Sequence, residues 1–200
     1  MFRCYHWTLR VTSDPPALAA FNSFWTNVNG VRDKFIRLWD FLSRRYRHFS
    51  NVIGYDLLNE PIGDEKLEIL PLYEEIGKII YKNDPTAILF VSPQISTASG
   101  IWWSNSEMPR PKLQNPFCYA VHFYEATSFI LGAYVSLPAG PAIWKSFDRM
   151  SSFAHDNWKV PLFIGEFGVE NHIKSKEALA TRLFEGLDNK FLSGAQWVYS

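Results

Sequence analysis

The stretch VIGYDLLNEP, residues 52–61, begins as an apolar run and ends abruptly in Asn59, Glu60 and Pro61. A run that is apolar on both faces is typical of a parallel strand that is covered on both sides. In parallel α/β sheets, functional groups gather at the carboxyl ends of the strands. If Glu60 is functional, we therefore expect further functional side chains at the carboxyl ends of the other strands.

Four further strand-like runs follow along the chain, with helical patterns around them. We expect the five strands at residues 51–59, 87–93, 117–124, 161–167 and 194–200. Apolar side chains at helical spacing indicate helices within residues 31–46, 72–80, 143–153 and 179–191. This alternation predicts an α/β fold in which outer helices cover a parallel sheet.

Two segments are expected to be less regular than the rest. Residues 11–21, VTSDPPALAAF, are predicted to be a loop-like lead-in to the first helix. Residues 94–116 are rich in Ser, Asn and Pro, so we predict a long irregular loop that can contain a short helix.

Polar and aromatic side chains mark the predicted strand ends. His122 and Tyr124 are two residues apart on the third strand, so both face the same side. Glycoside hydrolysis needs one carboxylic acid to protonate the leaving oxygen and one carboxylate to attack or to activate water. It also needs aromatic surface for the sugar ring. One rim of the sheet is predicted to hold a set that suits this reaction, namely Asn59, Glu60, His122, Tyr124, Glu166 and Trp197.

Five of these residues, all except Tyr124, have a structural alternative when they are taken singly. Asn59 could cap a helix in which Glu60 meets the helix dipole. Glu166 could be a turn residue, and His122 and Trp197 could be buried core residues. Their joint occurrence at one end of consecutive strands favours the functional interpretation.

The composition and the missing motifs argue against some classes of partner and cofactor. The chain has 200 residues, which suits one domain, and its 47% hydrophobic content is enough for a large core. The formal net charge is zero and there is no basic stripe, so we expect no nucleic acid partner. The sequence lacks a Cys/His cluster and a Gly-rich phosphate loop, so we predict no metal and no cofactor. Cys118 lies in an apolar run and is expected to be a core residue.

The segments YDLLNEP, VHFYE, FIGEFG and GAQWVYS, in that order, resemble glycoside hydrolase family 5. Members of this family are retaining enzymes on a TIM barrel, with catalytic carboxylates at the ends of strands four and seven. NVIGYDLLNEP followed by GD is most similar to the endoglycoceramidase-related branch, which cleaves the glycan from glycosylceramides. The resemblance implies that residues 1–200 form a single partial catalytic domain, matching strands four to eight of a (β/α)8 barrel.

The resemblance also implies roles for the two carboxylates. Glu60 would be the general acid/base and Glu166 the nucleophile. Retention of configuration needs the two carboxyl groups about 5 Å apart, whereas a separation beyond about 9 Å would exclude a retaining mechanism.

Further residues would bind the substrate or support the carboxylates. By the same resemblance, Asn59 would bond the sugar 2-hydroxyl and Tyr124 would hold Glu166. His122 would bond the substrate or the catalytic carboxylates, and Trp197 would be a platform under the sugar.

The chain departs from the family pattern in its length. Only five of eight strands are expected, and the family's Arg on strand two and His on strand three have no counterpart. We therefore expect a fragment of a larger hydrolase with open sheet edges at Val52–Asn59 and Gln196–Ser200. Open apolar edges predict self-association and little activity for the isolated chain. Full-length family members are usually secreted, but the chain itself leaves its localisation open.

Two apolar loops bear on the substrate. Trp102 and Trp103 could form a surface for the aglycone or a lipid, or they could pack over the barrel rim. Residues 127–144 could shape a hydrophobic cleft or touch a membrane surface, or they could form a buried short helix. We expect a glycolipid such as a glycosylceramide as the substrate and no obligate protein partner. The alternatives are an endo-β-glucanase or mannanase acting on polysaccharide, or an inactive sugar-binding fragment.

Overall fold

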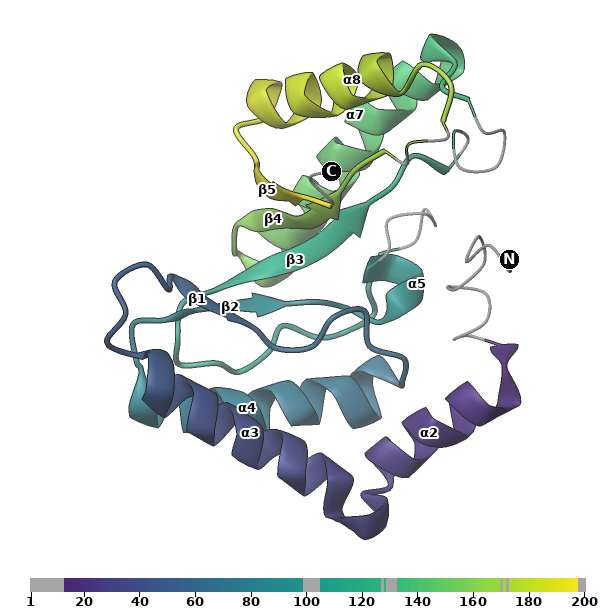
Figure 1. Cartoon of the computed structure of the whole chain (residues 1–200). Coiled ribbons are helices and arrows are strands. Elements are labelled where there is room, and N and C mark those ends of the chain that lie inside the picture. The colour runs from purple at the N-terminus through teal and green to yellow at the C-terminus, as the bar shows by residue number, and fades with distance from the viewer. Residues whose placement is uncertain are drawn as a thin grey trace.

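Five parallel strands form one curled sheet in this protein. The computed structural model describes residues 13–98, 105–126, 128, 133–169, 171 and 173–197. The strands are β1 (Gly54–Asp56), β2 (Ile88–Val91), β3 (Phe117–Phe123), β4 (Leu162–Phe167) and β5 (Ser193–Gln196), and they lie side by side in chain order. Every neighbouring pair is parallel. The predicted α/β fold is confirmed, and Figure 1 shows a curled sheet, as expected for part of a barrel wall.

Helices connect the strands and cover one side of the sheet. They are α2 (Pro15–Trp25), α3 (Val31–Tyr46), α4 (Leu70–Asn83), α5 (Ile95–Ala98), α7 (Ser136–Phe153) and α8 (Lys176–Asn189). Shorter helical turns are η1 (Val28–Gly30), η2 (Glu65–Ile69) and η3 (Ala154–Trp158). Figure 1 shows α3 beside α4 and α7 beside α8, each pair flanking one part of the sheet. The four helices expected from apolar spacing are confirmed.

The lead-in before α3 is not a loop, and that expectation was wrong. Residues 15–25 form α2, with Pro15 and Pro16 in its first turn. Proline suits this position because its missing N–H has no helical partner there and its fixed φ matches a helix. The indole nitrogen of Trp25 donates a hydrogen bond to the carbonyl of Ile62 at 2.6 Å, which fastens α2 to the segment after β1. The segment 94–116 is irregular apart from α5 in its described part, as expected.

The hydrophobic core lies between the sheet and the helices. Leu57 just after β1, Leu89 of β2 and Ile164 of β4 are fully buried. They belong to one core cluster with Ile76 of α4 and Leu183 of α8. Each side chain of this size stabilises the fold by about 1.5–3 kcal/mol relative to an exposed position. The central strand β3 is buried at all seven positions, so the sheet is covered on both faces at its centre.

The two ends of the sheet are open. In the described part of the chain, β1 pairs with β2 and β5 pairs with β4, so each of these outer strands has one neighbour. All four residues of β5 are exposed, and Ile53 just before β1 is 67% exposed. The expected open edges are therefore confirmed for the described residues.

The apolar segment 127–144 is helical over residues 136–144, where it forms the first half of α7. Ala139 and Ile143 are buried in the core, which confirms the buried-helix alternative for this part. None of the helices within the described residues combines the length and the apolar character needed to cross a bilayer.

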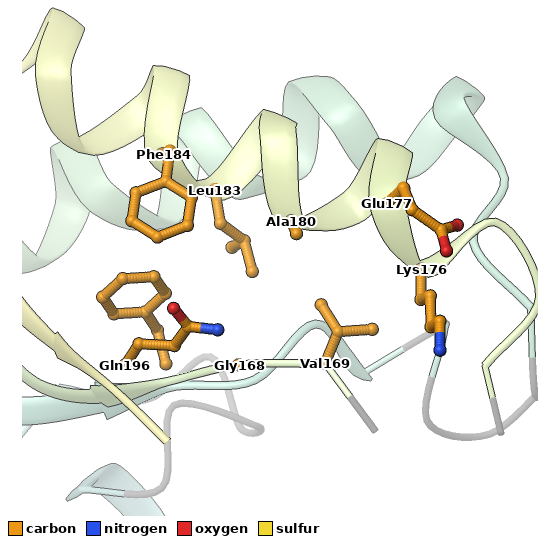
Figure 2. A pocket seen from close by; sticks show the side chains of 9 residues that line it. Gly168, Val169, Lys176, Glu177, Ala180, Leu183, Phe184 and Gln196 are labelled. Carbon is orange, nitrogen blue, oxygen red and sulfur yellow. The ribbon is translucent and has the colours of Figure 1, made fainter. Parts of the chain in front are cut away.

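A small hollow lies between the end of β4 and α8 (Figure 2). It has a volume of about 150 Å³, and its walls include Phe167 and Val169 on one side and Ala180 and Phe184 on the other. None of the predicted catalytic residues lines this hollow, so the chemistry is expected elsewhere.

Candidate active site

Glu60 enters the site through an unusual backbone turn just after β1. Its φ is +41°, in the left-handed region that a residue with a side chain rarely adopts. Such a conformation costs on the order of 1–2 kcal/mol, and strain of this kind is often kept at functional sites. The turn leaves Glu60 only 7% exposed.

The helix-cap alternative for Asn59 and Glu60 is wrong. The next helical turn, η2, begins only at Glu65, and its cap is Asp64, whose side chain accepts hydrogen bonds from the backbone of Lys66 and Leu67. The segment directly after Glu60 is held instead by α5, because the N–H of Ile95 donates to the carbonyl of Pro61 at 2.8 Å.

A β-bulge brings His122 and Glu166 opposite one another. Val121 pairs with Ile164, but His122 pairs with Glu166, so Gly165 is an extra residue on β4. Residues paired across two strands share a face, and the bulge therefore directs both side chains to the same side. Glu166 is thus a strand residue within β4 and not a turn residue.

Gly165 also makes room for the His122 ring. A Cβ at this position would lie 3.2 Å from Cδ2 of His122, which is tighter than ordinary contact. The sequence reasoning did not identify Gly165 as a functional residue. The signal was an isolated glycine inside a strand pattern, which is typical of a bulge.

Four of the predicted residues meet in one cluster. Nδ1 of His122 lies 2.7 Å from Oε1 of Glu60 and 3.4 Å from Oε2 of Glu166. The Tyr124 hydroxyl donates a hydrogen bond to the same Glu166 oxygen at 2.8 Å. One oxygen of Glu60, one oxygen of Glu166 and a ring nitrogen of His122 all lie within 4.8 Å of one another. The carboxylate separation is therefore close to the value of about 5 Å that retention requires.

Burial differs between the two carboxylates. The Glu60 side chain is 6% exposed and that of Glu166 is 22% exposed. Oε2 of Glu60 is buried and has no hydrogen-bond partner. A buried polar atom without a partner is costly, so the site favours a further group that bonds this oxygen.

Asp56 of β1 is a third carboxylate that the sequence reasoning missed. Desolvation by its surroundings raises the pKa of the Asp56 carboxyl, the nearby His122 lowers it, and the charge of Glu166 raises it. The residue remains exposed, so solvent screens these influences. The charges of His122 and Glu166 thus both act on the Asp56 carboxyl.

Glu65 ties together the segments around the site. Its carboxylate accepts hydrogen bonds from the backbone N–H of Gln94 at 3.1 Å, from the hydroxyl of Ser106 at 2.9 Å and from the N–H of Glu107 at 2.6 Å. A polar hollow of about 460 Å³ adjoins this tie. No local sequence pattern signals this role, because the partners of Glu65 come from segments far apart along the chain.

The remaining predicted residues are not brought into the cluster by described contacts. Asn59 is exposed beside Glu60. Trp197 is 59% exposed, and its backbone N–H donates to the carbonyl of Phe167 at 2.7 Å at the end of β4. Trp102 and Trp103 lie outside the described residues, so their expected role is a matter for experiment.

The same cluster contains potential metal ligands. In the part of the chain that the structure describes, Glu60, His122 and Glu166 are the one group of three His, Cys, Asp or Glu residues whose ligand atoms are close enough to share an ion.

Comparisons with known proteins point to one family. The model of the family described as cellulase, glycosyl hydrolase family 5, matches residues 9–200. The chain is 26% identical to Endoglucanase H of Acetivibrio thermocellus over 149 residues, covering 70% of this chain and 16% of that protein. It is 26% identical to an endoglycoceramidase of Cyanea nozakii over 134 residues, covering 56% of this chain and 25% of that protein.

The fold comparison agrees with the sequence comparison. The structure of endo-glycoceramidase II from Rhodococcus sp. in a complex with a cellobiose-like imidazole aligns with a TM-score of 0.80 at 18% identity. This alignment covers 96% of the present chain and 46% of the Rhodococcus chain. The chain thus spans less than half of the length of these similar proteins.

Proposed function

Because this chain belongs to glycosyl hydrolase family 5, we propose that it carries the two carboxylates of a retaining β-glycosidase that works by double displacement. The observation that supports this proposal most directly is the approach of a Glu60 oxygen and a Glu166 oxygen to within 4.8 Å. An inverting enzyme would need a wider gap, about 6.5–9.5 Å, to hold a water molecule between sugar and base.

Glu166 is the proposed nucleophile. It attacks the anomeric carbon and forms a covalent glycosyl-enzyme ester while the leaving group departs. The hydrogen bond from Tyr124 positions the Glu166 carboxylate and supports the negative charge that a nucleophile needs. Its 22% side-chain exposure leaves the carboxylate accessible to a substrate.

Glu60 is the proposed general acid and base. Its unpartnered Oε2 is the atom available to hold the proton that the leaving oxygen receives. In the second step Glu60 accepts a proton from water, and the resulting hydroxide cleaves the ester to release the sugar. His122 holds Oε1 of Glu60 at 2.7 Å, and this contact fixes the direction in which Oε2 points.

A glycolipid such as a glycosylceramide is the proposed substrate. The endoglycoceramidase relatives and the similarity to the Rhodococcus fold support this choice. A polysaccharide substrate of the endo-β-glucanase kind is the second candidate, because Endoglucanase H matches a larger part of the chain. The sugar that is released and the linkage that is cleaved are to be identified from the products of the substrate test.

The substrate is tested on the 200-residue chain, alone and with an N-terminal barrel segment of a family member restored in front of it. Hydrolysis of a glycosylceramide in preference to carboxymethylcellulose supports the glycolipid proposal. The opposite preference supports the second candidate. The glycosidase proposal is wrong if the restored protein folds and hydrolyses neither substrate nor an aryl β-glucoside.

The roles of the two carboxylates are tested by changing the leaving group. Glu60→Gln is expected to slow hydrolysis of a poor leaving group by about 10²–10⁴-fold, because the departing oxygen loses its acid. An activated aryl glycoside needs little protonation, so Glu60→Gln should form its covalent intermediate almost normally. Glu166→Gln is expected to abolish turnover of both. Equal losses in the rate of forming the covalent intermediate from both substrates in Glu60→Gln would contradict its role as the acid.

A further inference from the structure

The catalytic cluster presents a set of atoms that metal ions bind. Oε1 of Glu60, Oε2 of Glu166 and Nδ1 of His122 point toward a common region, and the nitrogen lies between the two oxygens at 2.7 and 3.4 Å. Imidazole and carboxylate ligands suit zinc and copper. Two carboxylates also neutralise a dication, so a bound ion would leave no net charge in this buried place.

The spacing is close to that of a tetrahedral site. Zinc lies about 2.0–2.2 Å from such ligands, so two ligands at tetrahedral angles are about 3.4 Å apart. The distance from His122 to Glu166 already has this value, at 3.4 Å. The distance from His122 to Glu60 would open slightly from 2.7 Å, and the two carboxylates would close slightly from their limit of 4.8 Å. Glu166 is partly exposed and can make that movement.

A second observation favours a further occupant at this cluster. Glu60 is more than nine-tenths buried, and its Oε2 has no hydrogen-bond partner. A metal ion held by both oxygens of the Glu60 carboxylate would satisfy Oε2 without a new protein donor. The Tyr124 hydroxyl on Glu166 would serve as an outer partner that orients a ligating carboxylate.

We propose that Glu60, His122 and Glu166 form a binding site for one divalent transition-metal ion, and that this ion blocks the catalytic cluster. On binding, Nδ1 of His122 releases its proton to solvent and donates its electron pair to the metal. The fourth position is open and takes a water molecule. Both carboxylates are then engaged, so neither can attack a sugar or transfer a proton. The block rests on the proposed function, whereas the binding does not.

Zinc titration tests the site directly. Cys4 and His6 lie outside the described residues and could bind zinc themselves, so every protein carries Cys4→Ser and His6→Gln. Zinc binding is followed by competition with a chromophoric chelator and by calorimetry. We expect one saturable site per chain. His122→Gln and Glu166→Gln should each weaken binding by roughly tenfold or more, and Tyr124→Phe by a smaller factor.

The chain offers a matched control for a histidine with a neighbouring carboxylate. Nδ1 of His155 lies 2.9 Å from Asp156, but both side chains are exposed, at 79% and 66%. His155→Gln is expected to leave zinc binding unchanged. Circular dichroism and melting curves identify the variants that fold, and Glu166→Gln is a partly exposed change that tests the site if His122→Gln does not fold.

The outcomes separate this inference from the proposed function. Tight zinc binding that a folded His122→Gln or Glu166→Gln variant retains would overturn the metal site, and so would a parent protein that binds no zinc. Loss of binding in both variants together with an unchanged His155→Gln supports it. A chain that binds zinc in this way and hydrolyses no glycoside would contradict the glycosidase proposal while leaving the metal site intact.

Discussion

At the scale of single residues, the site depends on how two backbone irregularities aim two carboxylates. The left-handed turn at Glu60 and the bulge at Gly165 are each a local departure from a regular strand. Each brings a carboxylate to the same histidine nitrogen, at 2.7 and 3.4 Å. The geometry of the cluster therefore depends on the backbone as much as on the carboxylates themselves.

Gly165→Ala tests the role of the bulge. The added Cβ would lie 3.2 Å from the His122 ring, so the ring must shift by a few tenths of an ångström. Because small misplacements of catalytic groups are costly, we expect turnover to fall by roughly tenfold while the fold persists. The control is Gly140→Ala in α7, where the nearest atoms are side-chain ends, Nε of Arg182 and the hydroxyl of Tyr134, both at 3.3 Å, and turnover should not change. Parent-like turnover in folded Gly165→Ala would contradict this role.

Cys118 gives a prediction about pH. Burial raises the pKa of its thiol from 9.0 to about 12. The native thiol therefore stays protonated at about pH 8 and should react with iodoacetamide far more slowly than an exposed cysteine. Between about pH 9 and 12 the unfolded chain loses this proton and the folded chain keeps it, so stability should fall as pH rises through that window. Alkylation rates in a Cys4→Ser background measure the first effect, and fast alkylation of the folded protein would contradict it.

Among the structural elements, the strands and helices with a regular apolar pattern were predictable, and the irregular segments were not. Continuous apolar runs predicted β1 to β5, and helical spacing predicted α3, α4, α7 and α8, because both signals are local. The helix α2 was missed because Pro15 and Pro16 were interpreted as loop residues when they occupy a first helical turn. Glu60, His122, Tyr124 and Glu166 were predicted together because each lies at or near the carboxyl end of a strand, and the structure brings their side chains into contact.

The bulge and the Glu65 tie illustrate what local patterns leave out. Gly165 becomes functional only through its position against His122 on another strand. Glu65 becomes structural only through Gln94, Ser106 and Glu107, which lie 29 to 42 residues further along the chain. Contacts of this kind depend on tertiary packing, so periodicity alone does not reveal them.

Glu65→Gln is expected to destabilise the fold. The amide group would place a donor against backbone N–H groups, leaving buried donors unsatisfied at a cost of about 1–3 kcal/mol. Glu107→Gln is the control, since its side chain is 83% exposed and its ion pair with Lys66 should contribute less than about 1 kcal/mol. Urea unfolding measures both. Equal, small effects would show that the Glu65 tie carries little of the stability.

At the scale of the whole molecule, the sheet is an open part of a barrel. Its outer strands β1 and β5 each have one neighbour among the described residues, and a closed barrel has no such edges. The residues of the cluster come from an edge strand and from the central strand of the sheet. Glu60 follows the edge strand β1, whereas His122 lies on the central strand β3. The stability of the edge thus bears on the geometry of the site.

The 200-residue chain is expected to self-associate. The exposed backbone of the edge strand β5 offers a template for pairing, and Phe191 nearby is a 97% exposed apolar side chain. Ala195→Lys places a charge on this edge and should reduce the associated fraction seen by light scattering. A monodisperse monomer with normal turnover of an aryl β-glucoside would contradict this expectation.

The close approach of the Glu60 and Glu166 carboxylates predicts double displacement. The most direct test is the configuration of the first sugar released from a β-glycoside by the protein with its barrel completed, followed by proton NMR before the product mutarotates. Retention, seen as the β-anomer appearing first, is the expected result. Initial release of the α-anomer would mean inversion and would contradict the account.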